Sequence, residues 1–355
     1  MASHWSHMSK RELAQVLDRT GVLEAILRAR TRGGTPWLTV LTYHRIHENP
    51  DGQPFDTGVI DATPSEFARQ MAIVRRYFTP IGIHELRDFM RGCALPPNPL
   101  IVTFDDGYRE CYERALPILV AQSVKATFFI ATSYVSKRRV FWWDRIAYIL
   151  NRTERDRLEL SYPMTLQLDC RRVARVQTGR TLLKLVKSHY GLDIERFLEE
   201  LASAAGVEWN SELERRLADE LVMNWNQVRE LHAAGMEIHS HTRTHRILQT
   251  VRPEELSSEL AGAREDLENQ LNERVSGVSY PVGRSISASP ALRAAVRDSG
   301  YEVGFSNGSG VSSLKGKFDP FDVRRISVER GLAPSYFRAL LAIPSFAETG
   351  EARRP

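Results

Sequence analysis

The feature that most constrains the fold is an alternation between short apolar runs and longer helical patterns. Gly235 and Gly300 each end a helical pattern immediately before an apolar run, as glycines at helix C-termini do. This rhythm is typical of βα units around a parallel sheet or barrel. With 355 residues, the chain is long enough for one such core and an additional subdomain.

The apolar runs and helical patterns give specific ranges. We predict strands at Trp37–Tyr43, Leu100–Phe104, Ala126–Ala131, Met236–His239, Val275–Tyr280, Tyr301–Phe305 and Val323–Val328. We predict helices between them at Pro64–Tyr77, Tyr108–Ala121, Trp225–Ala234, Pro253–Leu271 and Pro290–Gly300.

One segment, 139–223, is too long for this rhythm and is rich in Arg, Leu and Glu. It holds a predicted hairpin at Leu158–Leu168 and amphipathic helices at Gly179–His189, Ile194–Ala205 and Glu212–Val222. We interpret it as a mostly helical insertion between two βα units. The expected organisation is therefore an N-terminal extension (1–36), a split core (37–138 and 224–345), the insertion and a polar tail (346–355).

Composition excludes several classes of protein. Basic and acidic residues are interspersed and the formal net charge is only +4, so we expect no nucleic-acid-binding surface. Cys93, Cys111 and Cys170 are widely spaced and odd in number, which indicates a reducing compartment and no thiolate metal site. The N-terminus lacks a signal-peptide profile, and we therefore expect cytoplasmic residence, including the inner face of the membrane.

A helix is predicted at Ser9–Arg32, with apolar residues on one face among several Arg and Lys. One interpretation is that this helix packs on the rest of the domain. The other is a basic amphipathic helix that makes peripheral contact with a membrane surface.

Two short stretches carry the chemistry. Asp105 and Asp106 lie side by side at the end of a buried strand, where burial and mutual repulsion make a compensating cation favourable. A second predicted strand leads into His239, His241 and His245, and imidazole with carboxylate ligands is typical of zinc. These histidines taken alone could be solvated loop residues. Together the stretches predict a metal site, with one aspartate as ligand and its neighbour as a base.

These motifs resemble the polysaccharide deacetylases, the NodB-homology group of carbohydrate esterases. The resemblance rests on the following stretches in order: TFDDG (103–107), KATFFIATSYV (125–135), WNQVRELHAAGMEIHSHTRTH (225–245) and SYPVG (279–283). It implies an α/β fold, a distorted (β/α)7 barrel of NodB-homology type with chemistry at the C-terminal ends of the strands, here carrying the inserted subdomain.

The resemblance also implies roles for individual residues. Asp106, His241 and His245 would ligate a divalent metal, most often Zn²⁺, with Ni²⁺ or Co²⁺ as alternatives. Asp105 would be the general base, and the backbone N–H of Val282 would stabilise the oxyanion. The implied activity is metal-dependent removal of the N-acetyl group from an amino sugar of the GlcNAc type, in a glycan, glycolipid or lipid-linked intermediate.

The chain departs from the family pattern at several positions. Ser279 stands where many members carry an arginine that orients the base, and Arg324 or Arg325 is a candidate replacement. The C-terminal Leu-x-His motif is absent. However, the first strand ends at His44, as in the permuted poly-N-acetylglucosamine deacetylases, so we assign His44 as the general acid. The alternatives are a core role for His44 and His47 as the acid.

Two residues near the motifs have open roles. His239 occupies a position that is usually small in the family and is interpreted as a strand-end side chain. Asp144 lies near the predicted barrel mouth, but no spacing argument places it in the cleft.

The remaining candidates would contact substrate: Tyr108, Trp142, Trp143, Tyr280, Pro281 and Arg325. The two tryptophans could stack on a sugar ring or anchor the core of the insertion. Two other functions stay open on the same fold, a non-catalytic glycan-binding protein and an amide hydrolase acting on a non-sugar substrate.

Overall fold

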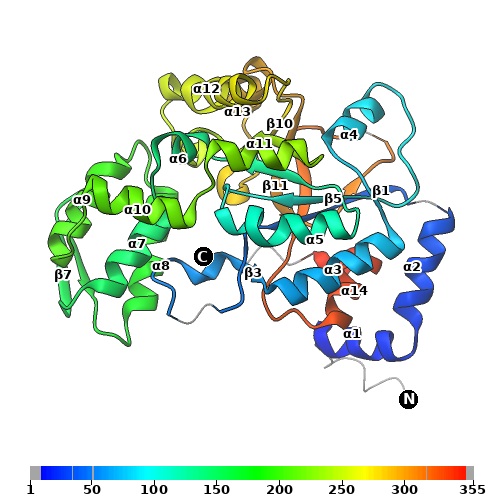
Figure 1. Cartoon of the computed structure of the whole chain (residues 1–355), viewed down its shortest axis with the longest axis horizontal. Helices are drawn as coiled ribbons and strands as arrows, with labels where there is room; N and C mark the ends of the chain where they lie inside the picture. Colours follow the sequence, from blue (N-terminus) through cyan, green and yellow to red (C-terminus); the bar gives the residue numbers. More distant parts are fainter. Residues whose placement is uncertain (1–8, 34, 50–51, 317, 349–355) are drawn as a thin grey trace.

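A closed barrel of parallel strands forms the centre of the protein (Figure 1). The computed structural model describes residues 9–33, 35–49, 52–316 and 318–348. In barrel order the strands are β1 (Trp37–Tyr43), β5 (Pro99–Phe104), β6 (Thr127–Ile130), β9 (Glu237–Ser240), β10 (Gly277–Ser279), β11 (Val303–Ser309) and β13 (Val323–Ser327), and β13 pairs with β1 to close the ring. All the predicted strands lie in this ring, which confirms the predicted fold class.

Short strands flank the ring. β4 (Thr79–Pro80) pairs with β5 in parallel, and β12 (Ser312–Ser313) pairs with β1 in antiparallel orientation. β2 (Arg45–Ile46) and β3 (Ile60–Ala62) form a separate parallel pair directly after β1. This pair brings the start of β3 back beside the C-terminal end of β1.

Helices connect the barrel strands, and most of them cover the outside of the barrel (Figure 1). They are α3 (Pro64–Tyr77), α4 (Ile83–Met90), α5 (Leu116–Ala121), α6 (Thr132–Lys137), α11 (Trp225–Ala233), α12 (Pro253–Leu271), α13 (Pro290–Asp298), α14 (Pro334–Ala342) and α15 (Pro344–Ala347). Local signals set their ends: reciprocal capping boxes begin α3 at Thr63 and α11 at Asn224, and prolines begin α12 and α13. The predicted helix at Tyr108–Ala121 begins as a π-helical turn over Cys111–Ala115.

The barrel interior is a packed apolar core. Alternate residues of its strands form one cluster with α4: Leu38, Val40, Ile101, Phe129, Val303, Phe305, Val323, Ile83 and Leu86. His239 is buried on β9 and its Nδ1 accepts the Gly277 N–H at 3.4 Å, which agrees with its interpretation as a strand side chain. The neighbouring buried carboxylates Asp105 and Asp106 lie directly after the C-terminal end of β5.

The segment predicted as an insertion lies on one side of the barrel, at the left of Figure 1 in green. Its elements are α7 (Trp142–Arg152), β7 (Arg157–Leu160), β8 (Leu166–Asp169), α8 (Arg175–Ser188), α9 (Ile194–Ala205) and α10 (Ser211–Leu221). β7 and β8 form the predicted antiparallel hairpin, and α7 packs against both α8 and α9. The helix α7 was not predicted, and it brings Trp142, Trp143 and Asp144 to the barrel.

The N-terminal extension forms two helices, α1 (Lys10–Arg19) and α2 (Val22–Gly33), so the prediction of one continuous helix was wrong. The chain turns at Gly21, whose φ of +75° favours glycine. Ala14, Leu23 and Leu27 are buried, and both helices pack against α14. The apolar face is thus used within the protein, and membrane contact stays a prediction. Within the described ranges, no helix has the length and apolar character needed to cross a bilayer.

Candidate metal centre and active site

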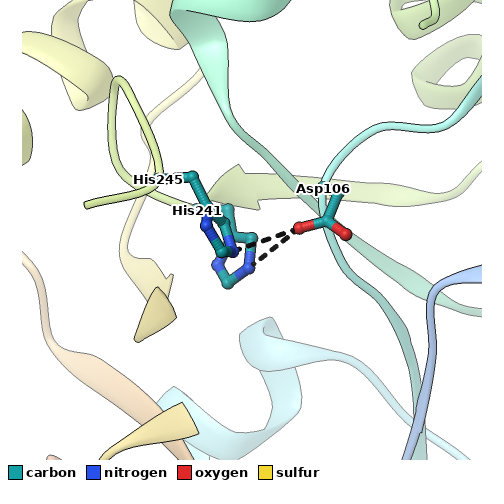
Figure 2. Close-up of side chains that lie close together, drawn as sticks. All are labelled: Asp106, His241 and His245. Atoms are coloured by element: carbon teal, nitrogen blue, oxygen red, sulfur yellow. Dashed lines mark ion pairs between the residues drawn. The ribbon is translucent and has the colours of Figure 1, made fainter. Parts of the chain in front are cut away.

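Asp106, His241 and His245 meet at the C-terminal end of the barrel (Figure 2). Asp106 follows β5, whereas His241 and His245 lie in the loop after β9. The Asp106 Oδ1 atom is 3.3 Å from Nε2 of His241 and 3.3 Å from Nε2 of His245. All three side chains are buried, and their candidate ligand atoms lie within 4.8 Å of one another.

This donor set suits a divalent cation. Oδ1 of Asp106 is buried and makes no hydrogen bond to the described residues, although two imidazole nitrogens face it. Such an oxygen is costly to bury unless a cation compensates it. His241 Nδ1 donates to the Ser279 carbonyl at 2.8 Å, which leaves its Nε2 with a free lone pair for a metal. Two imidazoles and a carboxylate match the preferences of zinc.

The protonation state of His245 agrees with ligation. Burial, and then the neighbouring His241, lower the pKa of His245 to about 3. The imidazole is therefore neutral near pH 7, as a metal ligand must be.

The backbone around this cluster adopts unusual conformations. Asp106, Thr242, His245 and Val282 have φ of +75°, +63°, +54° and +60°. Positive φ is uncommon outside glycine and is an outlier for a β-branched residue such as Val282. Strain of this kind persists only where the surrounding structure enforces it, and it concentrates at functional sites.

Asp105, next to this cluster, is held by a buried arginine from β13. Arg325 donates from its two terminal nitrogens to the two oxygens of Asp105, each at 2.8 Å. Ser279 Oγ donates to the same carboxylate at 3.2 Å. Burial alone would raise the pKa of Asp105, but Arg325 and His241 outweigh it and hold that pKa well below its usual range. Asp105 is therefore ionised, as a base must be.

Of the two candidate arginines, the structure brings Arg325 to Asp105 and leaves Arg324 on the exposed side of β13. Arg325 was also a candidate for substrate contact. Its guanidinium is fully buried against Asp105, a geometry that supports positioning of the carboxylate instead.

His44 follows β1 and pairs with Asp61 of β3. Its Nδ1 lies 2.9 Å from Asp61 Oδ2, which also accepts the His44 backbone N–H at 2.5 Å. Burial opposes the charged imidazolium, but Asp61 and, more weakly, Asp106 and Asp105 raise the pKa of His44 to about 9. The ring is thus protonated near pH 7. His47 instead lies 3.6 Å from Glu110, and burial lowers its pKa.

Asp61 is a residue that the sequence analysis missed. A histidine with a raised pKa needs a carboxylate partner. Nothing in the local sequence around position 61 indicates which carboxylate supplies it.

The aromatic candidates for substrate contact are buried in internal contacts. Trp143 Nε1 donates to the Tyr108 hydroxyl at 2.6 Å, and that hydroxyl donates to Asp144 at 2.7 Å. Tyr280 donates to the Phe321 carbonyl at 3.0 Å, and Pro281 is buried beside it. Trp142 is also buried, with its ring centroid 5.1 Å from that of Trp143, so both tryptophans favour the anchoring role over stacking on a sugar. Asp144 is fully buried, and this burial raises its pKa to about 7.

Comparison with known families gives a match. The sequence model of the family described as polysaccharide deacetylase matches residues 94–160 and 202–304. This region, slightly less than half of the chain, is similar to a polysaccharide deacetylase domain. The match includes Asp105, Asp106, His241 and His245, and its gap, 161–201, falls inside the segment predicted as an insertion. His44 and Asp61 lie before the matched region.

Two relatives are similar to part of this chain. The poly-β-1,6-N-acetyl-D-glucosamine N-deacetylase of Escherichia coli K12 is 26% identical over 166 residues, 44% of this chain and 22% of that protein. The Bacillus subtilis protein YxkH, whose name provisionally describes a polysaccharide deacetylase, is 30% identical over 115 residues, 32% of this chain and 39% of that protein. The matched parts span less than half of either relative.

Solved structures share the fold of most of the chain. The Streptococcus pyogenes deacetylase PplD superimposes with a TM-score of 0.57 at 17% identity, covering 89% of this chain and 100% of that one. IcaB from Ammonifex degensii gives a TM-score of 0.53 at 18% identity, covering 89% and 99%. At these identities the likeness establishes the barrel fold alone.

Proposed function

We propose that this deacetylase domain is a metal-dependent hydrolase that removes the N-acetyl group from a GlcNAc-type amino sugar and releases acetate. The observation that carries the proposal is the buried Asp106, His241 and His245 cluster, with the separately held Asp105 beside it. A protein that only binds glycan has no need for an ionised, unligated carboxylate next to a metal site. The pairing of a ligand set with a base supports hydrolysis.

The cation, for which we propose Zn²⁺, would be held by Asp106, His241 and His245. It would supply polarisation of the acetyl carbonyl and a lowered pKa for the attacking water. Every remaining part of the chemistry falls to side chains and backbone of the chain.

Asp105 accepts the proton of the attacking water. Arg325 fixes both oxygens of its carboxylate, so the base cannot rotate away from the reacting atoms. Ser279 links the base to the metal cluster, since its hydroxyl donates to Asp105 and its carbonyl accepts from His241.

His44 supplies the proton that the leaving amine needs. Its raised pKa keeps the imidazolium form available near pH 7, and Asp61 orients the ring. The backbone N–H of Val282, in its left-handed conformation, is the proposed donor to the oxyanion. As the C–N bond breaks, the acetyl carbon leaves as acetate and the amine leaves with the proton from His44.

The substrate class rests on the deacetylase domain and on the E. coli relative, which is named for poly-β-1,6-N-acetyl-D-glucosamine. We propose a β-linked GlcNAc glycan or a lipid-linked GlcNAc for this chain. The test is acetate release by zinc-loaded protein from nucleotide sugars, lipid-linked GlcNAc, short β-linked GlcNAc oligomers and an N-acetylated non-sugar amide.

The expected result is release from at least one GlcNAc substrate, with none from chelator-treated protein. Release only from the non-sugar amide would overturn the substrate class. No acetate release from any substrate, together with glycan binding and a full zinc content, would overturn the enzymatic proposal in favour of a binding protein.

A further inference from the structure

The two histidines of the metal cluster are oriented in different ways. His241 is fixed by the hydrogen bond from its Nδ1 to the Ser279 carbonyl. His245 has no such bond: its Nδ1 is buried, and the described residues offer it no hydrogen-bond partner. Metal-binding histidines normally donate their second nitrogen to an acceptor that sets the orientation of the ring. The orientation of His245 must therefore come from packing.

Trp143 supplies that packing. Its ring lies against the His245 imidazole with ring centroids 4.4 Å apart and an interplanar angle of 55°. Trp143 in turn stacks on Phe141, with centroids 4.8 Å apart and planes within 9°. The position of the His245 ring thus depends on where the indole of Trp143 stands.

A chain of short hydrogen bonds fixes the indole. Trp143 Nε1 donates to the Tyr108 hydroxyl at 2.6 Å, which donates to Asp144 Oδ2 at 2.7 Å. Asp144 Oδ1 accepts the backbone N–H of Asp56 at 2.8 Å. Each donor in this chain has one acceptor, so the chain defines one arrangement rather than several.

This series of hydrogen bonds connects the surroundings of two proposed metal ligands, Asp106 and His245. Tyr108 is two residues after Asp106 and is buried, whereas Trp143 and Asp144 belong to the first turn of α7. The hydrogen bonds therefore connect the inserted segment to the strand end that carries Asp106. The ring contact between Trp143 and His245 extends this connection to the second ligand.

We infer that Asp144, Tyr108 and Trp143 position the His245 imidazole for metal binding, so that the inserted helix α7 completes the metal centre. They are positioning residues and ligate nothing themselves. The inference rests on the proposed metal centre. It also assigns a role to the Trp-Trp-Asp stretch at 142–144, which the proposed chemistry does not use.

Zinc affinity, measured by competition with a chromophoric chelator, tests this inference without any activity assay. Tyr108→Phe removes one hydroxyl and keeps the ring, and Trp143→Leu removes the contact with His245. Each is expected to raise the zinc Kd by about 10- to 100-fold, the usual effect of losing a group that orients a ligand. Trp143→Phe keeps an aromatic ring against His245 and is expected to restore part of the affinity.

The matched control is Tyr148→Phe, which removes a hydroxyl from the same helix, where the Tyr148 ring contacts Phe55 and Trp209. It is expected to bind zinc like wild type. Thermal unfolding of the zinc-free variants shows which are folded. A folded Tyr108→Phe or Trp143→Leu protein with wild-type zinc Kd would overturn the inference alone. Wild-type protein that binds no zinc would overturn the proposed metal centre and the inference with it.

Discussion

Arg325 on β13 holds Asp105 at the end of β5 through two hydrogen bonds of 2.8 Å, with β1 lying between the two strands in the barrel. Both side chains are almost completely buried. A bidentate arginine–carboxylate pair fixes geometry as well as charge. The pair therefore holds the proposed base ionised and beside the cluster of Asp106, His241 and His245.

Replacing Arg325 by Met should inactivate the proposed base, Asp105, at the acid end of the pH range. Without the guanidinium, burial dominates and the pKa of Asp105 rises, so the carboxylate becomes protonated at a pH where wild type is ionised. The acid limb of kcat/KM should move to higher pH. Loss of the buried partner should also cost about 3–5 kcal/mol of stability.

A pH–rate profile and denaturant unfolding measure these two effects of Arg325→Met. Arg324→Met is the matched control, because Arg324 lies on the exposed side of the same strand. An acid limb at the wild-type position in folded Arg325→Met protein would show that Arg325 does not control Asp105.

Asp61→Asn should shift the alkaline limb of the same profile. A general acid acts while protonated, so wild-type activity should persist below the His44 pKa of about 9 and fall as pH rises through it. Without the Asp61 charge this pKa should fall toward 6.5 or below. The loss of rate at pH 8 should then be about tenfold or more.

His47→Gln is the control for that shift, because His47 pairs with Glu110 rather than Asp61. Its alkaline limb should match wild type. If Asp61→Asn keeps the wild-type limb while His47→Gln moves it, then His47 is the acid and the assignment of His44 is wrong.

Zinc should stabilise the folded protein through Asp106, His241 and His245. A ligand at about 100 times its Kd adds about 2.7 kcal/mol to the free energy of unfolding. Asp106→Asn should abolish this increment, seen as the rise in Tm on adding zinc. His239→Asn should keep it, because His239 lies outside the cluster. An equal zinc-induced rise in Asp106→Asn protein would mean that zinc binds elsewhere.

The sequence predicts the barrel well because each strand is a short apolar run bounded by helical patterns. The sequence also contains the signal that distinguishes Arg325 from Arg324 as the partner of the base. Val323 and Arg325 are two residues apart on one strand and so share the inward face. The break at Gly21 was missed because the helical spacing of apolar residues continues across it. The short helices α4 and α6 offer too few turns for a clear period.

The parts that could not be predicted depend on contacts between distant segments. Asp61 reaches His44 only because β3 pairs with β2 directly after the first barrel strand. Trp143 meets His245 only because α7 packs back onto the barrel. The sequence alone favours an anchoring role for Trp142 and Trp143 in the insertion over stacking on a sugar, and it gives no sign of this contact. Residue types and spacing along one strand do not specify such pairings.

The most direct test of this account compares zinc content and acetate release in wild type and Asp105→Asn, using the best GlcNAc substrate of the panel. We predict equal zinc contents, with acetate release reduced by about 10²- to 10⁴-fold in Asp105→Asn, because Asp105 is the base and does not ligate the metal. Undiminished turnover by Asp105→Asn protein would mean that Asp105 is not the base.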